Sequence, residues 1–358
     1  MILLDKHFPQ LGHCSYERGG LDMRILVTGG AGYIGSHVCV ELLQNGHEVI
    51  VLDSLANSQV EALNRVQELT GKFLTFHKGD VRDALILNKI FRQYEIDCVI
   101  HLAALKSVTE SIQHPMMYYD TNVAGTIQLL QIMEKYQIHQ LIYSSSIGIY
   151  GDVLGELIQE DRNVCFPKNP YLATKFIGEQ LIQEFLKEDP QLKAVVFEYG
   201  NPAGAHPSGR IGECSLLTKG SIFNNMCESA WGQKPFFIYG DQYDTKDKTA
   251  VRDYIHVCDI ARAHQSALKK MNSIQGMNRY ILSSGVPVSV KDVLTQFQTS
   301  NQLILDVHVS DKRQGDISEC AGNSSKAQAE LGWEVVHSLD EICKDAWRFK
   351  KENPKGYR

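Results

Sequence analysis

Three glycines spaced three residues apart constrain the fold of this 358-residue chain more than any other feature. Gly29, Gly32 and Gly35 lie between the apolar run 24–27 and the segment 36–43, whose apolar residues have helical spacing. In a strand–turn–helix unit, the first glycine permits a tight turn and the second lets backbone N–H groups approach a pyrophosphate. The third lets the helix lie close to the strand. The pattern predicts a phosphate-binding turn that opens an α/β domain.

The second apolar run ends on an acidic residue where such turns recognise a ribose. Gly46 ends the predicted helix, and the strand 48–52 leads directly to Asp53. This acid follows Gly35 by 18 residues, which is close to the spacing of dinucleotide-binding domains. The next arginine is Arg65, so no cation follows closely to hold a 2′-phosphate. The sequence therefore favours NAD over NADP as the cofactor.

Apolar runs and helical patterns continue to alternate over the first 200 residues. This alternation is typical of β-α units, which place helices on both faces of a parallel sheet. We therefore predict an α/β fold with a doubly wound parallel sheet of the Rossmann type. Further strands are predicted at 73–76, 98–104, 141–146 and 194–197, and helices near 84–94, 115–136 and 170–188.

Composition and charge exclude several classes of protein. The formal net charge of −6 argues against a partner nucleic acid bound by counterion release. No run of 18 apolar residues is present, which predicts no membrane span. The nine cysteines are widely spaced, so we expect no metal site and reduced thiols in a cytoplasmic protein. Residues 1–22 resemble neither a secretory signal nor a mitochondrial presequence, and we expect a disordered extension.

A tyrosine and a lysine share one face of a predicted helix. Tyr171 and Lys175 are four residues apart in the helix 170–188. A base near neutrality needs the tyrosine pKa to fall by about 3 units, and a neighbouring ammonium or a positive nicotinamide ring favours the phenolate. The serines 144–146 end the preceding strand, at the sheet edge where ligands bind. Ser146, Tyr171 and Lys175 are the predicted catalytic residues.

These segments together resemble the extended short-chain dehydrogenase/reductase family, and within it the UDP-hexose 4-epimerases. The resemblance covers the chain from Met23 to about Tyr357. The glycine turn and the Tyr/Lys pair mark only the superfamily, whereas 201–209 and 251–257 are much more specific. The segments that carry the resemblance are 27–37, 102–106, 118–120, 144–146, 171–175, 201–209 and 251–257.

The resemblance implies an NAD-dependent isomerase of galactose metabolism that interconverts UDP-galactose and UDP-glucose. Tyr171 would take the proton from the sugar 4-hydroxyl while C4 gives a hydride to NAD. Lys175 would bind the nicotinamide ribose and lower the pKa of Tyr171, and Ser146 would hydrogen-bond the same sugar oxygen. The 4-keto sugar would rotate and receive the hydride on its other face. NAD is regenerated in each cycle and can stay bound.

The same match assigns the remaining site residues. Lys106 would offset pyrophosphate charge, and Arg252 and Arg313 suit a diphosphate because a guanidinium binds two oxygens at once. Residues expected to contact NAD are Gly29, Gly32, Tyr33, Ile34, Gly35, Asp53, Asn57, Ser58, Asp80, Val81, Leu102, Ala103, Ala104, Lys106, Ser146, Tyr171 and Lys175. Residues expected to contact the UDP-sugar are Lys106, Ser146, Tyr171, Asn201, Ser221, Phe237, Tyr239, Arg252, Arg313, Asp316 and Cys320.

Cys320 falls where members of the family differ in pocket size. A bulky aromatic residue there resembles enzymes restricted to the glucose and galactose nucleotides. A cysteine leaves room for an N-acetyl group. The resemblance therefore implies that UDP-GlcNAc and UDP-GalNAc are also accepted.

The sequence departs from the family at three places. Glu198 and Gly200 stand where the family usually has Arg and Phe, so a charge is reversed and an aromatic wall is lost. We expect this loss to loosen the site. The segment 219–222 replaces a usual Asn-Asn-Leu, and Gly148 removes a hydroxyl near the sugar. These changes leave Ser146, Tyr171 and Lys175 intact.

Two other functions fit parts of the sequence. A dehydratase or decarboxylase of nucleotide sugars shares the scaffold, but dehydratases carry an acidic pair where Ile147-Gly148 follows Ser146. A non-catalytic protein that binds NAD or a nucleotide sugar is the second alternative, and Glu198 and Gly200 support it.

The expected organisation is two lobes and two copies. Residues 23–200 form the predicted NAD-binding domain, 201–358 form a smaller C-terminal α/β lobe for the UDP-sugar, and 253–268 return to the first domain. The resemblance implies a homodimer that forms through helices in 115–136 and 170–188.

Overall fold

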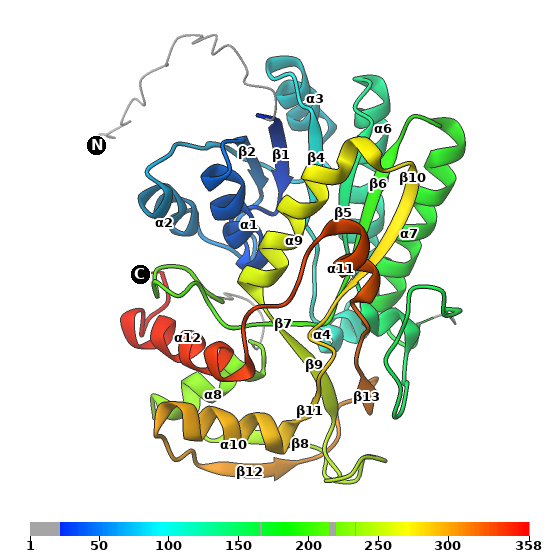
Figure 1. Ribbon diagram of the computed structural model, residues 1–358. Helices are drawn as coiled ribbons and strands as arrows, with labels where there is room; N and C mark the ends of the chain where they lie inside the picture. Colours follow the sequence, from blue (N-terminus) through cyan, green and yellow to red (C-terminus); the bar gives the residue numbers. More distant parts are fainter. Residues whose placement is uncertain (1–21, 165–166, 215–219, 233, 358) are drawn as a thin grey trace.

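A seven-stranded parallel sheet forms the centre of the first lobe in the computed structural model, which describes residues 22–164, 167–214, 220–232 and 234–357 (Figure 1). Its strand order is β10-β6-β5-β4-β1-β2-β3, so the direction of winding changes between β1 and β4. Ligands bind at this kind of switch point in doubly wound sheets. The strands are β1 (Arg24–Thr28), β2 (Glu48–Asp53), β3 (Thr75–Lys78), β4 (Cys98–His101), β5 (Gln140–Ser146), β6 (Lys193–Tyr199) and β10 (Gly276–Leu282).

Helices cover both faces of this sheet, and each face has its own apolar core (Figure 1). On one face lie α1 (Tyr33–Gln44), α2 (Val60–Thr70), α9 (Val257–Lys270) and α11 (Ser325–Leu331). On the other lie α3 (Ala84–Gln93), α6 (Gly125–Lys135) and α7 (Pro170–Glu188). The predicted doubly wound α/β fold is confirmed. The strands are buried on both sides because their apolar runs are continuous.

The seventh strand of the sheet comes from late in the chain. β10 pairs with β6 in parallel along its whole length. The segment that packs with the first lobe therefore extends beyond the expected 253–268. At the opposite edge, β3 begins at Thr75 and not at Phe73, whose side chain is 88% exposed. Residues 1–21 of the expected N-terminal extension lie outside the described residues.

The second lobe packs three helices around short strands. One sheet has the order β11-β9-β13 with β7 paired to β9, and the other pairs β12 with β8. The helices share an apolar core with Phe236, Ile238 and Tyr254. The elements are β7 (Asn201–Ala203), β8 (Phe236–Tyr239), β9 (Val251–His256), β11 (Pro287–Ser289), β12 (Val307–Ser310), β13 (Glu319–Cys320), α8 (Ile222–Ala230), α10 (Val290–Asn301) and α12 (Leu339–Glu352).

The expected single helix over 115–136 is divided into three parts. A short helix α5 (Pro115–Tyr118) and a π-helix η1 (Tyr119–Ala124) precede α6. Asn122, in the middle of η1, is 2% exposed and bonds to neighbouring elements, which fixes this turn in place. Such π turns occur often at functional sites. Other short helices are α4 (Val108–Gln113), η2 (Ile147–Tyr150) and η3 (Met271–Ser273).

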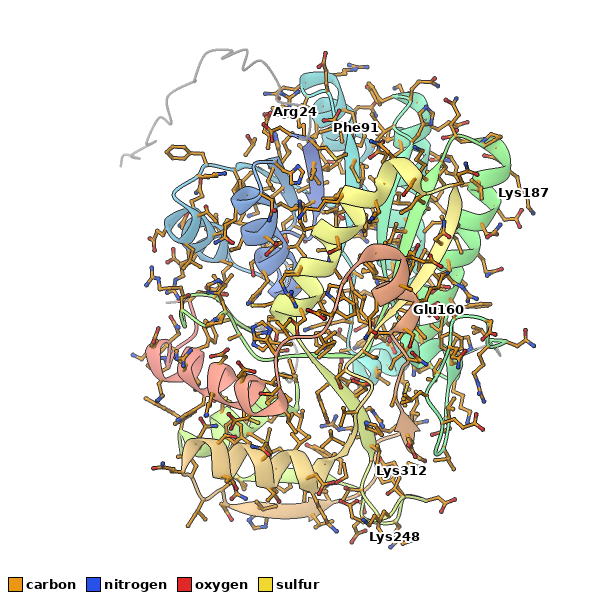
Figure 2. The ribbon with its side chains drawn as sticks, viewed as in Figure 1. Arg24, Phe91, Glu160, Lys187, Lys248 and Lys312 are labelled. Carbon is orange, nitrogen blue, oxygen red and sulfur yellow. The ribbon has the colours of Figure 1, made fainter. Side chains whose placement is uncertain are left out.

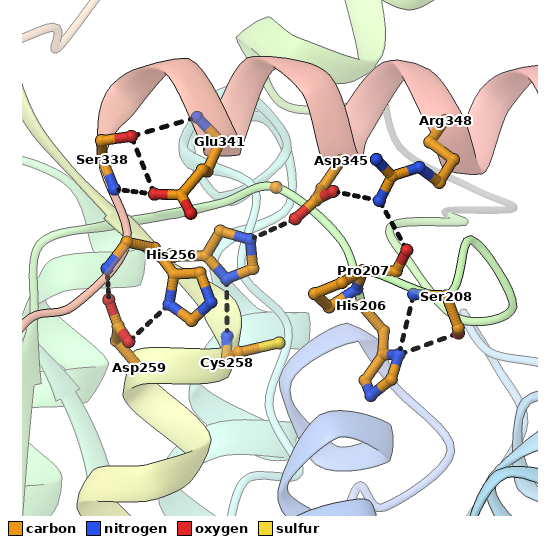
Figure 3. Close-up of polar contacts among 12 residues, drawn as sticks. His206, Pro207, Ser208, His256, Cys258, Asp259, Ser338, Glu341, Asp345 and Arg348 are labelled. Atoms are coloured by element: carbon orange, nitrogen blue, oxygen red, sulfur yellow. Dashed lines mark hydrogen bonds and ion pairs between the residues drawn. The ribbon is translucent and has the colours of Figure 1, made fainter.

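A network of histidines and carboxylates joins α12 to the start of α9 (Figure 3). His256 Nδ1 accepts a hydrogen bond from Cys258 N, and its Nε2 lies 3.3 Å from Asp345. Its ring stacks on His337 with centroids 4.1 Å apart, and His337 lies 2.7 Å from Asp259. These contacts hold the second lobe against the helical layer of the first. Within the described ranges, no helix is long and apolar enough to cross a membrane.

Candidate active site

The glycine turn brings β1, α1 and the segment after β4 into close contact. Gly29 has a φ of +74°, and a Cβ at this position would lie 2.7 Å from Ala103 N. A Cβ at Gly35 would lie 2.2 Å from the Gly29 carbonyl oxygen. Helix α1 starts at Tyr33 with no side chain capping its first amide groups. The positive end of the helix is thus available to an anion, which fits a pyrophosphate.

The predicted ribose acid lies beside this turn. Asp53 ends β2 and accepts hydrogen bonds from Ala31 N at 3.0 Å and Leu55 N at 2.9 Å. Ser58 Oγ donates to the same carboxylate at 2.7 Å, and Asn57 lies in the same loop. The structure brings these predicted residues together at the carboxyl edge of the sheet, where they suit a ribose.

Asp80 and Val81 follow the neighbouring strand β3. Arg82 lies 2.7 Å from Asp80 and holds the pKa of that carboxyl below its usual range. Val81 is 5% exposed and packs in the core beneath α6. Asp80 and Val81 therefore lie at the same edge of the sheet as Asp53.

The segment Leu102–Lys106 is attached to β1 and to the π-helix. Leu102 N donates to the Thr28 carbonyl at 3.1 Å, and Ala103 N donates to Thr28 Oγ1 at 3.3 Å. Asn122 bonds to both the N–H and the carbonyl of Leu105, at 2.8 and 3.0 Å. Ala104 lies between these anchors. Sequence reasoning missed Asn122, although it follows the motif 118–120 directly.

The three predicted catalytic residues come from the end of β5 and the start of α7. Ser146 ends β5 and caps the turn η2, where its Oγ accepts from Gly148 N at 3.2 Å. Asn169 caps α7 through Leu172 N, which sets the position of Tyr171. Lys175 is 5% exposed. Its Nζ donates to the carbonyl and the Oγ of Ser144, at 2.8 and 3.1 Å.

Burial shifts the pKa values of Tyr171 and Lys175 in opposite directions. It raises the pKa of Tyr171 to about 12 and lowers the pKa of Lys175 to about 8. The direction for Tyr171 is opposite to the lowering that a base near neutrality needs. The difference arises because the loss of water disfavours the phenolate, while Lys175 is bonded to Ser144. A cation must approach Tyr171 before it can act as a base near neutrality.

The predicted UDP-binding residues of the second lobe form two separate contacts, one around Arg252 and one around Arg313. Arg252 on β9 donates to Asp316 at 2.6 Å, and the Tyr243 hydroxyl donates to the other oxygen of Asp316 at 2.9 Å. The Arg313 guanidinium lies 4.0 Å from the centroid of the Tyr239 ring. Beside it, Phe237 is 40% exposed. Asn201 begins β7, next to β9.

Cys320 is enclosed by apolar side chains near the end of β5. It is 3% exposed, and its Sγ lies 3.6 Å from the Ile147 carbonyl. Ile281 and Tyr150 belong to the same cluster. The small Cys320 side chain therefore lies beside η2, the turn that begins directly after Ser146. This is the position at which a larger residue would project toward the same turn.

An unpredicted carboxylate joins two of the predicted anion-binding residues. Glu213 Oε1 lies 3.3 Å from Lys106 Nζ. Ser221 N donates to both oxygens of Glu213 at 3.3 Å, and Ser221 Oγ donates to Oε2 as well. Glu213 is thus held by groups that are expected to meet phosphate. The sequence did not indicate Glu213, because Lys106 lies 107 positions away in the chain.

The departures from the family have structural counterparts. A Cβ at Gly200 would lie 2.8 Å from Ser283 Oγ, and a Cβ at Gly148 would lie 2.8 Å from a Leu172 methyl group. The space beside both glycines is therefore filled, and the expected loosening is not seen at these points. Glu198 is fully buried and lies 3.7 Å from Arg279. Of the segment 219–222, residue 219 lies outside the described residues.

Comparisons with known proteins agree with this geometry. A family profile described as GDP-mannose 4,6 dehydratase matches residues 26–346. UDP-glucose 4-epimerase of Bacillus subtilis is 43% identical over 340 residues, covering 94% of this chain and 99% of that protein. The Mus musculus enzyme of the same name is 40% identical over 341 residues, covering 93% and 98%.

Solved structures lead to the same family. UDP-glucose 4-epimerase from Bifidobacterium longum, in complex with NAD+ and UDP, superposes with a TM-score of 0.91 at 37% identity and covers 93% of this chain and 99% of its own. The chain belongs to the extended short-chain dehydrogenase/reductase family that the dehydratase profile describes. Within that family it groups with the UDP-glucose 4-epimerases.

Proposed function

We propose that this protein is an NAD-dependent enzyme that interconverts UDP-galactose and UDP-glucose by inversion at C4. The observation that carries this function is the 43% identity to UDP-glucose 4-epimerase over 94% of the chain. Ser146, Tyr171 and Lys175, the predicted catalytic residues, are all present in this chain. The enzyme is an isomerase of nucleotide sugars.

The chain's own residues fit NAD. Gly29 and Gly35 let the turn and α1 pack closely, and Gly32 would let backbone N–H groups approach the pyrophosphate at the start of α1. Asp53 with Ser58 would hold the adenosine ribose. The remaining contacts would come from Tyr33, Ile34, Asn57, Asp80, Val81 and the Leu102–Lys106 segment. The chemistry that NAD supplies when bound is reversible acceptance of the hydride from sugar C4.

Tyr171 is the general base in this proposal. It would take the proton of the sugar 4-hydroxyl and return it after the 4-keto sugar has turned over. A positive charge near Tyr171 lowers the pKa of its phenol, and Lys175 is the cation that α7 places one turn away. Ser146, at the end of β5, would hold the sugar oxygen by a hydrogen bond.

The second lobe would hold the UDP part of the substrate. Arg252 and Arg313 are suited to the diphosphate, and Asp316 orients Arg252 through the contact of 2.6 Å. The half-exposed Phe237 and Tyr239 would line the uracil. Asn201, Ser221 and Lys106 would complete the diphosphate contacts, and Cys320 would border the sugar.

Tolerance of N-acetylated sugars is part of the proposal. The resemblance places the small Cys320 where a bulky aromatic residue restricts the pocket, and its Sγ lies 3.6 Å from the Ile147 carbonyl at the start of η2. A solved structure described as the UDP-Glc/GlcNAc 4-epimerase of Campylobacter jejuni is 30% identical, with a TM-score of 0.79. We therefore assign UDP-GlcNAc and UDP-GalNAc as a second substrate pair.

We also assign a cytoplasmic homodimer. The seven cysteines that the described ranges include are all free. Met116, Met117 and Ile127 expose 71%, 40% and 37% of their surface, and all three lie in the predicted dimer segment 115–136. Apolar side chains gathered on one segment favour a protein partner.

A turnover assay tests the proposed function. Purified protein would receive UDP-galactose without added NAD, and UDP-glucose would be resolved over time. We expect conversion toward a mixture of the two sugars, and loss of about 10²- to 10⁴-fold in Tyr171→Phe, since a general base contributes about that factor. Tyr94→Phe, at the far end of α3, is the matched control.

The possible results of this assay separate the alternatives. No conversion, even with NAD supplied, would favour a binding protein. Formation of a dehydrated or decarboxylated product would favour the alternative enzymes. Unchanged turnover in Tyr171→Phe would remove Tyr171 as the base.

A further inference from the structure

Two acidic side chains are buried directly behind the candidate catalytic residues. Glu179 on α7 is 1% exposed and Glu198 on β6 is 0% exposed. Ser145 on β5 is the parallel register partner of Glu198, and its Oγ donates to Glu179. The Tyr150 hydroxyl donates to Glu198 at 2.9 Å. The two carboxyls therefore lie on the face of the sheet that α7 covers.

A cation from the neighbouring strand lies beside Glu198. Arg279 on β10 places Nη1 3.7 Å from Glu198 Oε1. It lies two residues before Ile281, the register partner of Glu198, so its side chain emerges on the same face. Glu198 Oε1 has no hydrogen-bond partner among the described residues. Two carboxylates held close together in a dry site are costly, and a proton held by one of them reduces that cost.

The charged and titratable neighbours of the pair come from every element around it. They are Lys175 on α7, Tyr143 on β5, Tyr150 in η2, Arg279 on β10 and Glu160 in the loop before α7. Glu160 accepts from Ile281 N at 2.8 Å and lies near the end of β10 (Figure 2). Burial raises the pKa of Glu179, and burial together with the charge of Glu179 raises the pKa of Glu198.

Glu179 is connected to the candidate catalytic residues through one neighbouring serine. Ser145, which bonds to Glu179, directly precedes Ser146 in β5. Glu179 follows Lys175 by one helical turn, and its negative charge raises the pKa of Lys175 while burial lowers it. A negative charge on Glu179 therefore helps Lys175 to hold its proton against the effect of burial.

We propose that Glu179, Glu198 and Arg279 are positioning residues for the epimerase reaction: the two carboxyls share one proton, and the single negative charge that remains keeps Lys175 an ammonium beside Tyr171. The inference rests on the proposed function. It also explains how the chain carries an acid at 198, where its family usually has an arginine. The neighbouring strand supplies the cation through Arg279.

The pH dependence of kcat tests this arrangement. We expect a step in the wild-type profile between about pH 6 and 9, where the second carboxyl of the pair ionises. Glu198→Gln keeps the contact with Tyr150 and should remove the step. Arg279→Met should move it to higher pH by about one unit, because a nearby cation favours the carboxylate. Arg279→Lys keeps the charge and should retain the wild-type profile.

A second measurement needs no activity. Both carboxyls have a folded pKa above the ordinary value of about 4.3, so the folded protein binds more protons and loses stability as pH rises through the raised pKa values. Glu198→Gln removes this loss. Its Tm relative to wild type should therefore increase from pH 5 to pH 8. Glu48→Gln, at the start of β2 where Glu48 is exposed and pairs with Arg24, should show a constant difference over this range.

The pH profile of kcat and the Tm series distinguish a failure of this inference from a failure of the proposed function. Absence of wild-type turnover overturns the epimerase assignment, and the Tm series then still reports on the shared proton. A loss of kcat that is equal at every pH in Glu198→Gln, with the step retained, overturns the positioning role. A Tm difference that does not change with pH overturns the shared proton.

Discussion

Lys106 Nζ lies 3.3 Å from a carboxylate oxygen of Glu213, although 107 residues separate them in the chain. The same carboxylate is held by Ser221 at the N-cap of α8. Lys106 follows a strand of the first lobe and Ser221 begins a helix of the second. The Glu213 side chain therefore joins the two lobes at the point where the substrate diphosphate is expected.

Replacing Glu213 by Gln should strengthen substrate binding. The diphosphate must compete with a carboxylate for Lys106 and Ser221, and a hydrogen bond to a charged group contributes about 1.5 kcal/mol. We expect KM for UDP-galactose to fall about tenfold, with little change in kcat. Steady-state kinetics measure this. Asp340→Asn removes the carboxylate of a lysine pair on α12 and is the control. A rise in KM would show that Glu213 orders Ser221 for the substrate.

Gly35→Ala should remove bound NAD. The new Cβ would lie 2.2 Å from the Gly29 carbonyl, so α1 must move away from β1. Such overpacking costs about 1–3 kcal/mol. The nucleotide released on denaturation, together with Tm, reports both effects. At Gly71 the helix end is open, with no atom within 4 Å of a Cβ, so Gly71→Ala should keep the nucleotide. Full NAD content in Gly35→Ala would contradict the assigned role of this turn.

Cys320→Tyr should separate the two substrate pairs. The cysteine is 3% exposed and packs beside Ile147, so a tyrosine must project toward the sugar side of η2. We expect interconversion of UDP-GlcNAc and UDP-GalNAc to be lost, while UDP-galactose is still converted. Parallel assays with both pairs measure this. If the wild-type enzyme converts only the plain pair, the assignment of N-acetylated substrates is wrong.

His101 should make the protein less stable in acid. This buried side chain lies 2.7 Å from Thr28 Oγ1 and 3.1 Å from Thr126 Oγ1. Burial lowers its pKa to about 3. The unfolded chain binds its proton near pH 6.5, so the stabilising effect of neutral His101 declines as pH falls below 6.5.

The matching variant is His101→Gln, compared with His308→Gln at an exposed site. Between pH 6.5 and 4.5, His101 should cost wild type about 2–3 kcal/mol of unfolding free energy that the glutamine does not lose. Denaturant unfolding at several pH values measures the gap between the two proteins. A gap that stays constant with pH would contradict the neutral state of His101.

Much of the first lobe could be predicted because its signals are local. Strands that are buried on both faces have continuous apolar runs in the sequence. Gly29 and Gly35 mark the turn from β1 into α1. The position of β10 could not be predicted. Its partner β6 ends 77 residues earlier, and the polar Asn278 and Arg279 interrupt the apolar pattern. Pairing between distant segments leaves little trace in either one.

The candidate site likewise contains residues that the sequence predicts and residues that it does not. Tyr171 and Lys175 are four residues apart on one helix, so their spacing predicts their common face. The partners of Glu198 and Lys106 come from other elements, and only folding brings Arg279 and Glu213 to them. The direction of the Tyr171 pKa depends on burial, which no short motif reports.

The late position of β10 has a consequence for synthesis of the chain. Until Leu282 has left the ribosome, β6 is the outer strand of the growing sheet, and at about 5–20 residues per second that period lasts seconds. An unpaired apolar edge invites pairing with other nascent chains. Glu198 places a carboxylate on that edge. Glu198 is buried in the finished sheet, and in the unfinished sheet its charge would disfavour pairing of the open strand with another chain.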